Sequence, residues 1–460
     1  MNAKRGIAAL IGFALVAVVT LGPWYLGQRA EQAYRDQLAA LERQPKGWRV
    51  VTEDYRRGWF SSQASAELAP TQEGLADALR LRIDSHLTHG PQGLSDLTWP
   101  PTLTRADSLL ALDHPMVQLS GVRAQTRIGW DGDALTRVEL PAMDQPADDN
   151  RLGLRIAAGQ GELHVGRAGP IAARIELPAL ELLDAQGHAF LALRGLKAAN
   201  EITPWLPGLG IGSGDLSIAE AAVQAPDLEI DARDLHIAIG SHQDAGLLEI
   251  LISYSVATLR IDGADYAPSQ IDISLNRLGG EALSAVQTDL AEIAAQDQPE
   301  AMAGIARLAV LMRHLPELAV TNPSIAIKHL DIATPEGQVS GHLTLGVQGL
   351  TATDLLSKGA WIQRLTGDGE LSLPRRVALK LATRAILQKT QGASDHQDRP
   401  PLTADQEQAA ADAATAQLDG LLSSGWIGAE GDRIKTTLML ADGLLTINGK
   451  TLPIGITGAQ

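Results

Sequence analysis

Cysteine is absent from the 460 residues, and aromatic residues are scarce: Trp, Tyr and Phe occur 8, 5 and 3 times. The absence of cysteine excludes disulfides, thiol nucleophiles and thiolate metal ligands, and it suits an oxidising compartment. Half of the aromatic residues lie within the first 60 positions. The core of the remaining chain must therefore be built from Leu, Ile, Val and Ala.

Positive charge is also in deficit, because 38 Lys and Arg residues face 54 Asp and Glu residues, a net charge of −16. Nucleic-acid binding needs a basic surface, so this balance argues against it. It also disfavours broad adhesion to anionic lipid, except at a local basic patch. The hydrophobic share of 45% and the charged share of 20% are typical of an ordered globular chain.

Motifs of catalysis and cofactor binding are missing: there is no G-x-S-x-G, no HExxH and no paired-carboxylate signature. His86 and His89 could share a metal only on a helix, and no third ligand is near, so we predict surface histidines. The glycine-rich stretch 208–214 (GLGIGSG) fits neither nucleotide-binding loop, and we predict a flexible turn. No catalytic, cofactor-binding or metal site is predicted.

The most distinctive segment is an uncharged run that begins at Ile7 and ends at Leu26. Twenty residues at about 1.5 Å per residue match the ~30 Å hydrocarbon layer, which predicts a transmembrane helix. Lys4 and Arg5 precede it, so the N-terminus is expected in the cytoplasm and the body on the other side. The alternative, a cleaved signal peptide, lacks a small-x-small cleavage site.

The body alternates apolar and polar residues, which predicts antiparallel strands with one buried face. The expected strands cover 152–156, 162–165, 173–177, 228–239, 249–261, 271–275 and 325–332. Asp262-Gly263, Asp442-Gly443 and Asn448-Gly449 are the turn signals between such runs. Helical spacing predicts helices at 281–295, 300–315, 375–389 and 404–422, the third opened by Pro374.

The expected fold class is therefore α+β and β-rich: an N-terminal transmembrane helix plus elongated antiparallel sheets, with several helices in the C-terminal half. We divide the chain into a cytoplasmic tail (1–6), a transmembrane anchor (7–26), a helical stalk (27–45), a β-rich region (46–280), a helix-containing α/β region (281–426) and a C-terminal β-hairpin that completes the body (427–460).

Four patterns, in order along the chain, resemble one family. They are the run followed by YRRGWFSS (55–62), then LP (315–316) with NP (322–323) and DIATPEG (331–337), then LSLP (371–374), and last LMLADGLLTINGK (438–450). This sequence is similar to the YdgA-like proteins of Gram-negative bacteria, a domain of unknown function. The resemblance implies a periplasmic body, anchored in the inner membrane, that can form homodimers. It carries over no catalytic residue.

Seven residues are candidates for structural or interaction roles. Gly58 is expected to turn the chain off the stalk, Trp59 and Phe60 to plug the body, and Gly443 to adopt a positive φ. Arg376, Lys380 and Arg384 recur every fourth residue and form a basic stripe on the third helix. The stripe could meet anionic headgroups or an acidic partner, or it could be ordinary solvated surface.

The favoured function is a non-enzymatic envelope protein that acts through self-association or protein contacts. The alternative is a carrier or sensor of lipid-like ligands, and a weaker one is a periplasmic hydrolase whose scattered Ser, His and Asp residues converge in space. The first two differ in one observable feature. Helices that cover the apolar side of the sheet would indicate a closed scaffold, whereas an uncovered apolar surface would favour the carrier.

Overall fold

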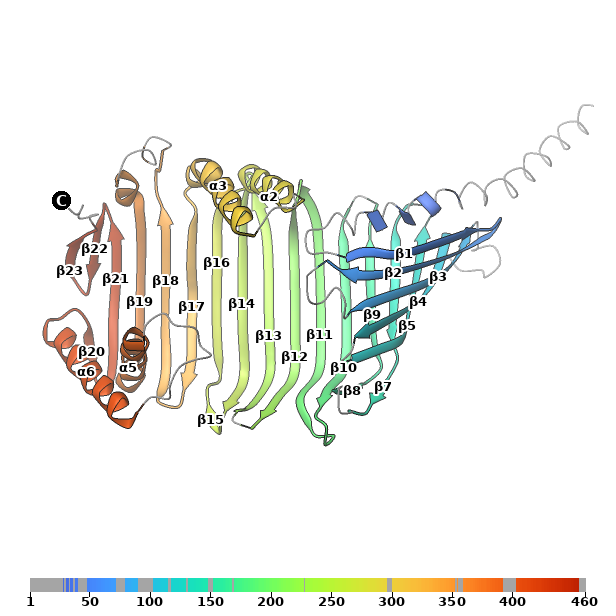
Figure 1. The fold of residues 1–460 in the computed structure, drawn as a ribbon. Helices are drawn as coiled ribbons and strands as arrows, with labels where there is room; N and C mark the ends of the chain where they lie inside the picture. The colour runs from blue at the N-terminus through green and yellow to red at the C-terminus, as the bar shows by residue number, and fades with distance from the viewer. Residues whose placement is uncertain are drawn as a thin grey trace, which may run out of the picture. The chain divides into compact units, whose positions relative to one another are not determined.

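The computed structural model describes residues 28–454, except for positions 29, 33, 36–37, 40–47, 72–78, 90–101, 115–116, 130, 148–151, 168, 227, 296–299, 352–353, 355–358 and 392–402. The chain forms two compact units. The first holds residues 1–226 and 287–307, and the second holds residues 227–286 and 308–460. Helices α2 and α3, which are labelled in Figure 1, contribute residues to both.

Antiparallel strands build the first unit. They are β1 (Trp48–Arg57), β2 (Ser61–Pro70), β3 (Arg80–His89), β4 (Thr102–His114), β5 (Val117–Gly129), β6 (Ala134–Leu140), β7 (Met143–Gln145), β8 (Gly153–Ile156), β9 (Gly159–Val165), β10 (Ile171–Leu183), β11 (Ala189–Leu206) and β12 (Leu209–Ala225). Strands β1 to β6 pair in chain order, β6 then pairs with β9, and β10 pairs with β8, β9 and β11.

The second unit is also antiparallel. Its strands are β13 (Leu228–Asp244), β14 (Leu247–Ile261), β15 (Ala264–Asp265), β16 (Ser269–Gly279), β17 (Ser324–Thr334), β18 (Gly337–Val347), β19 (Leu365–Pro374), β20 (Gly428–Glu430), β21 (Arg433–Ala441), β22 (Leu444–Ile447) and β23 (Lys450–Pro453). The helices are α2 (Gly280–Ala295), α3 (Glu300–Ala319), η2 (Ala360–Arg364), α5 (Arg375–Gln391) and α6 (Ala404–Ser423).

The core of the first unit lies on one side of β1–β3. Leu38, one of the described helical residues before β1, packs with Ala66 and Leu68 of β2, and Tyr34 and Trp48 surround them. Because side chains alternate along a strand, the residues next to Ala66 and Leu68 in β2 point to the opposite side. That opposite side is polar.

The core of the second unit lies where α5 and α6 meet the sheet. Leu373 of β19, Ile434 of β21 and Leu418 of α6 are buried together, and Val377 of α5 packs against them. Helix α6 begins at Thr403, whose hydroxyl accepts from the Gln406 backbone N–H, while the Gln406 amide bonds back to the Thr403 backbone. This capping box fixes where the helix starts.

The predicted fold class needs correction. None of the helices in the part of the chain that the structure describes is both long and apolar enough to cross a membrane. The longest, α3 and α6, each carry several charged residues, which lowers their hydropathy. The run from Ile7 to Leu26, on which the transmembrane helix was predicted, lies outside the described residues. The described chain is mostly antiparallel sheet, with four α-helices between its later strands.

Candidate functional site

The second unit carries a continuous apolar surface on one side of its sheet. In register across five strands lie Ile239, Ile252, Ile273, Ile327 and Leu343. Residues two positions away on the same strands, or three positions away on β17 where a bulge intervenes, point to the same side. They form two flanking rows: Ile250, Leu275, Ile325 and Leu345 on one side, and Ile237, Tyr254, Ile271, Leu330 and, on β19, Leu371 on the other. We call these three rows the apolar face.

Between the two ends of the strands, part of the apolar face is open to solvent, while Ile252, Ile273, Ile327 and Leu343 of its central row are half-buried. Ile239, Tyr254, Ile325, Leu345 and Leu371 are exposed by 46, 41, 47, 38 and 39%. Along the strands, toward both ends, the same side becomes covered: Leu248 of β14 and Leu373 of β19 are buried. A surface of this kind on a folded protein usually marks a binding site.

Helix placement explains why the middle stays uncovered. Helix α5 follows the end of β19. The end of β19 lies beside the start of β18, and therefore at the end of the sheet where β16 begins. Helix α2 follows the end of β16, at the opposite end of the strands. The helices of the second unit thus lie at the two ends of its strands, as Figure 1 shows for α2 and α5. Between them, no helix of the described residues lies over the apolar rows.

The dimensions of the apolar face are those of a narrow band. Five inter-strand spacings of about 4.8 Å, from β13 to β19, give a length of about 24 Å. Three rows along a strand that rises about 3.4 Å per residue give a width of about 14 Å. The band therefore covers about 330 Å², well below the ~800 Å² per partner of a stable protein interface.

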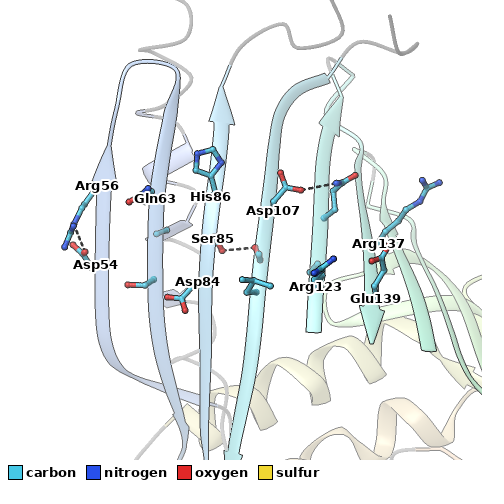
Figure 2. Close-up of a pocket in the computed structure, with 16 residues that line it drawn as sticks. Asp54, Arg56, Gln63, Asp84, Ser85, His86, Asp107, Arg123, Arg137 and Glu139 are labelled. Carbon is cyan, nitrogen blue, oxygen red and sulfur yellow. Dashed lines mark hydrogen bonds and ion pairs between the residues drawn. The ribbon is translucent and has the colours of Figure 1, made fainter. Parts of the chain in front are cut away.

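The first unit carries a second candidate, an open hollow of about 870 Å³ on the polar side of β1–β6. Figure 2 shows the side chains that line it, among them Asp54, Arg56, Asp84, His86 and Arg123. Most of its charges are already paired: Arg56 lies 2.8 Å from Asp54, and Arg82 lies 2.9 Å from Asp84. Exposed pairs of this kind leave little net charge to attract an ion.

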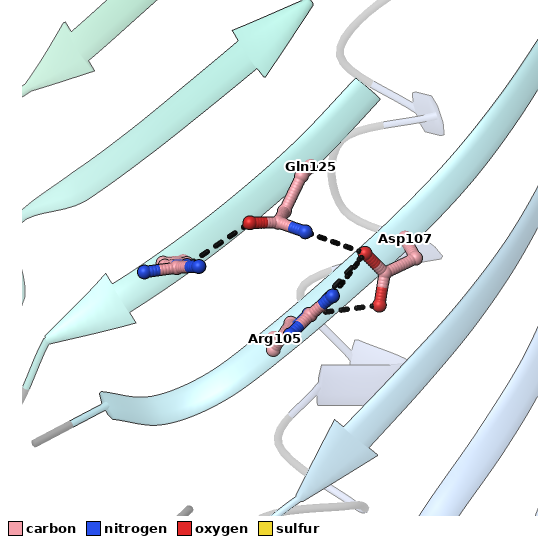
Figure 3. A network of polar contacts seen from close by, with 4 residues as sticks. Arg105, Asp107 and Gln125 are labelled. Atoms are coloured by element: carbon pink, nitrogen blue, oxygen red, sulfur yellow. Dashed lines mark hydrogen bonds and ion pairs between the residues drawn. The ribbon is translucent and has the colours of Figure 1, made fainter. Parts of the chain in front are cut away.

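The best-connected residue of the hollow is Asp107 (Figure 3). Its carboxylate accepts hydrogen bonds from Arg105 at 2.9 Å and from the Gln125 amide at 3.0 Å, and Gln125 in turn accepts one from Arg127. Burial works to raise the pKa of Asp107, but the hydrogen bonds and the Arg105 charge outweigh it and hold the pKa below its usual value. Asp107 is therefore ionised at neutral pH and already satisfied, which leaves it little capacity to act as an acid or base.

A buried polar pair lies at the opposite side of the same strands. The Ser62 hydroxyl and His89 Nε2 are 2.8 Å apart, and both residues are almost fully buried. His89 Nδ1 has no hydrogen-bond partner among the described residues. Burial, helped by nearby His86, lowers the pKa of His89, so the ring is neutral at pH 7. The prediction of two surface histidines was thus wrong for His89, whereas His86 is exposed.

Ser62 and His89 do not form a hydrolytic site as they stand. A nucleophilic serine needs access to substrate, and a catalytic imidazole is oriented by a third group on its other nitrogen. Ser62 is 2% exposed, and the other nitrogen of His89 meets no carboxylate in the described chain. Nor do the described residues contain a group of three or more His, Asp or Glu side chains that could hold a metal ion.

The predicted residues of the β1–β2 hairpin behave differently from one another. The Gly58 N–H donates to the Ser61 carbonyl at 2.8 Å, and a Cβ at Gly58 would approach that oxygen to 2.6 Å, so the tight turn requires glycine. Trp59 and Phe60 are 48 and 52% exposed at the hairpin tip. About half of the surface of each ring is therefore in solvent, and the role as a plug stays a prediction.

The basic stripe is present on the solvent side of α5. Arg376, Lys380 and Arg384 are all exposed. Lys380 pairs with Glu336, which raises the pKa of Lys380 and lowers that of Glu336. Arg376 and Arg384 make no ion pair with any residue that the structure describes. Only two of the three cations are therefore available to a partner.

The turn predictions are confirmed by the backbone. Asp442 and Gly443 have φ values of 52° and 73°, and the two other dipeptides, at 262–263 and 448–449, also have positive φ at both residues. These are the conformations that type I′ turns require. The stretch 208–214, by contrast, was wrongly predicted as a flexible turn: only Gly208 lies in the turn, and the rest belongs to β12.

Comparison with known proteins places the chain in a family. Residues 2–455 match the family model described as "Bacterial protein of unknown function (DUF945)". The chain belongs to this family. The match confirms the resemblance to a bacterial family of unknown function that the sequence motifs indicated. No curated protein and no solved structure matched the chain.

Sequence reasoning missed the apolar face as a candidate site. The alternation of β13, β14 and β16–β18 was visible, but a buried strand face and an uncovered one have the same pattern. The signal that could have found it is the placement of α2 and α3 after β16 and of α5 and α6 after β19.

Proposed function

We propose that the protein is a non-enzymatic binding protein that carries an amphiphile by laying its hydrocarbon chain on the apolar face. The supporting observation is a set of five large apolar side chains, 38 to 47% exposed, spread over the three rows of the apolar face between the covered ends of the strands. The proposal favours the carrier over the closed scaffold, because the described helices cover the apolar side of the sheet only at the ends of the strands.

The shape of the apolar face supports a chain-like ligand rather than a protein. The band is long and narrow, and its area is less than half of what one side of a stable protein interface buries. Each methylene that leaves water contributes up to about 0.8 kcal/mol, so a chain that lies across six strands gains binding energy along its whole length. The face offers few hydrogen-bonding groups apart from the Tyr254 hydroxyl, which suits a hydrocarbon better than a polar ligand.

The test is to purify the full-length chain without added lipid, extract it with organic solvent and identify the released molecules by mass spectrometry. In one variant, Ile239→Gln and Ile325→Gln place two amides on the apolar face. The matched control, Leu251→Gln and Met439→Gln, changes two exposed apolar residues on the opposite side of the same sheet. We expect an amphiphile with the wild type and the control, and several-fold less with the first variant. Equal amounts in all three, or none in any, would contradict the carrier function.

The proposal includes an envelope location, with the body in the periplasm. It is supported by the lack of cysteine and by the motifs that resemble inner-membrane-anchored periplasmic proteins. A reporter that is active only in the periplasm, fused after Gln460, should be active. Activity only of a cytoplasmic reporter at the same position would contradict this location.

A second candidate, self-association or contact with another envelope protein, is favoured by Trp59 and Phe60. Aromatic side chains at an exposed hairpin tip are typical anchors of protein interfaces, and both are about half exposed. Sedimentation of the full-length chain over a range of concentrations tests this. A shift of the wild type toward larger species at high concentration would support self-association if the double variant Trp59→Ser, Phe60→Ser lacks this shift. Identical sedimentation of the wild type and the variant would oppose it.

A further inference from the structure

Helix α3 presents its apolar side to solvent. Its outward residues Met302, Ile305, Leu308, Leu311, Met312 and Leu315 are exposed by 58, 66, 60, 47, 60 and 40%. Its inward residues include small ones, and Ala303, Val310 and Ala319 are buried. Surface helices normally bury the apolar stripe and expose the polar one, so α3 is inverted.

The exposed side of α3 is apolar over a wide arc. At about 100° per residue, the six outward side chains span about 180° of the helix circumference. Arg313 lies at the margin of this arc, and Arg307 lies outside it. The arc contains no aromatic ring and no side chain that donates a hydrogen bond. It therefore lacks the Trp, Tyr and Arg anchors and the hydrogen bonds that give protein interfaces their affinity and specificity.

The area of this side is also too small for a second copy of the chain. From Met302 to Leu315 the helix rises about 20 Å, and with a diameter of about 10 Å it offers about 200 Å². A stable protein interface buries about 800 Å² per partner. A lipid surface imposes no such minimum, because a single helix can lie in it with its apolar side about 5–10 Å deep.

We propose that the outward side of α3 docks on the surface of a lipid bilayer. This contact differs in place and in occupant from the amphiphile on the apolar face. Since the arc carries no charge, the contact needs no anionic lipid and is insensitive to salt. That property separates it from any contact made by the cations of α5, which would need anionic headgroups.

The absence of cysteine makes a site-specific test direct. Met312→Cys in the full-length chain receives an environment-sensitive fluorophore and is mixed with phosphatidylcholine vesicles whose acyl chains carry bromine atoms. The matched control is Ala413→Cys, an exposed position on the polar side of α6. We expect at least twofold quenching at position 312 relative to unbrominated vesicles, unchanged by salt, and no quenching at position 413.

Three outcomes would overturn the proposal: no quenching at position 312, equal quenching at both positions, or a concentration-dependent blue shift at position 312 without lipid. The last would show that a second copy covers the helix. A further variant, Leu308→Glu with Ile305→Glu in the Met312→Cys chain, should abolish quenching. Because both substitutions lie on the exposed side, its melting temperature and its content of extracted amphiphile should stay the same. The docking and carrier proposals can therefore fail separately.

Discussion

At the scale of single residues, two positions show how local chemistry constrains the fold. His89 is neutral and buried beside Ser62, so protonation would place an uncompensated charge in the first unit. Gly443 occupies a backbone conformation that side chains with a Cβ rarely adopt. Each therefore leads to a measurable prediction.

We expect the protein to lose stability as the pH falls below the ordinary histidine value. Because burial lowers the pKa of His89 in the folded state, the unfolded state binds the proton first. This contribution is fully present above a pH of about 6.5 and declines as the pH falls through that value, by at most about 1.4 kcal/mol per pH unit. Urea unfolding of the wild type from pH 7.5 to 5 should show this slope, and His89→Gln should flatten it. His188→Gln, which changes an exposed histidine, should leave the slope as it is; an identical slope in all three proteins would rule out His89 as its source.

Gly443→Val should lower the free energy of unfolding by about 1–3 kcal/mol, because valine is strained at a φ of 73°. The control is Gly240→Val: this glycine lies in β13 without a positive φ, and an added Cβ would meet nothing within 4 Å. Thermal unfolding of both variants should lower the melting temperature of the first only. Equal melting temperatures of the two variants would mean that valine at position 443 is not strained.

At the scale of elements, the helices stabilise the fold by burying apolar side chains of the sheet. Leu418 of α6 is 6% exposed and packs on Leu373 and Ile434 of the sheet, whereas Leu421 on the same helix is 36% exposed. Leu418→Ala should cost about 2–5 kcal/mol through lost burial and a cavity. Leu421→Ala, the control, should cost much less. If urea unfolding gave equal losses, the packing of α6 on Leu373 and Ile434 would be wrong.

The elements were also the part of the fold that could be predicted. Apolar alternation identified the strands, and helical spacing identified α2, α3, α5 and α6, with α3 continuing beyond the predicted end through Pro316. Positive φ at Gly443 followed from its Asp-Gly turn. The candidate sites did not follow, because Ile239 or Leu308 has the same pattern whether another element covers it or not. The burial of His89 depended on the strand pairing with β2, which no local signal gives.

At the scale of the whole molecule, the net charge of −16 makes any cationic patch a local exception. With Lys380 paired to Glu336, two of the three cations of the basic stripe have no ion-pair partner among the described residues. Each is worth about 1 kcal/mol near an anionic membrane. We expect full-length chain to prefer anionic over zwitterionic vesicles at low salt by up to about 30-fold, a preference that salt removes.

Arg376→Glu with Arg384→Glu should abolish this preference in a vesicle co-sedimentation assay. The control, Arg123→Glu with Arg174→Glu, makes the same change of charge at exposed positions in the first unit and should keep it. A preference that both variants lose equally would reflect net charge rather than the stripe, and no preference in the wild type would leave the stripe as ordinary surface.

The order of the strands has a consequence for how the molecule is made. Along β1 to β6, and again along β16 to β19, each strand pairs with the one before it in the chain. Most of these steps therefore close a comparatively short loop, the exception being β16 to β17, which α2 and α3 separate. Short loops keep the entropic cost of a step low for an all-β topology. We expect each of these two runs to grow strand by strand as the polypeptide emerges, with the newest strand of the run at its unprotected edge. The growing end, rather than the finished molecule, is then where a chaperone would be needed.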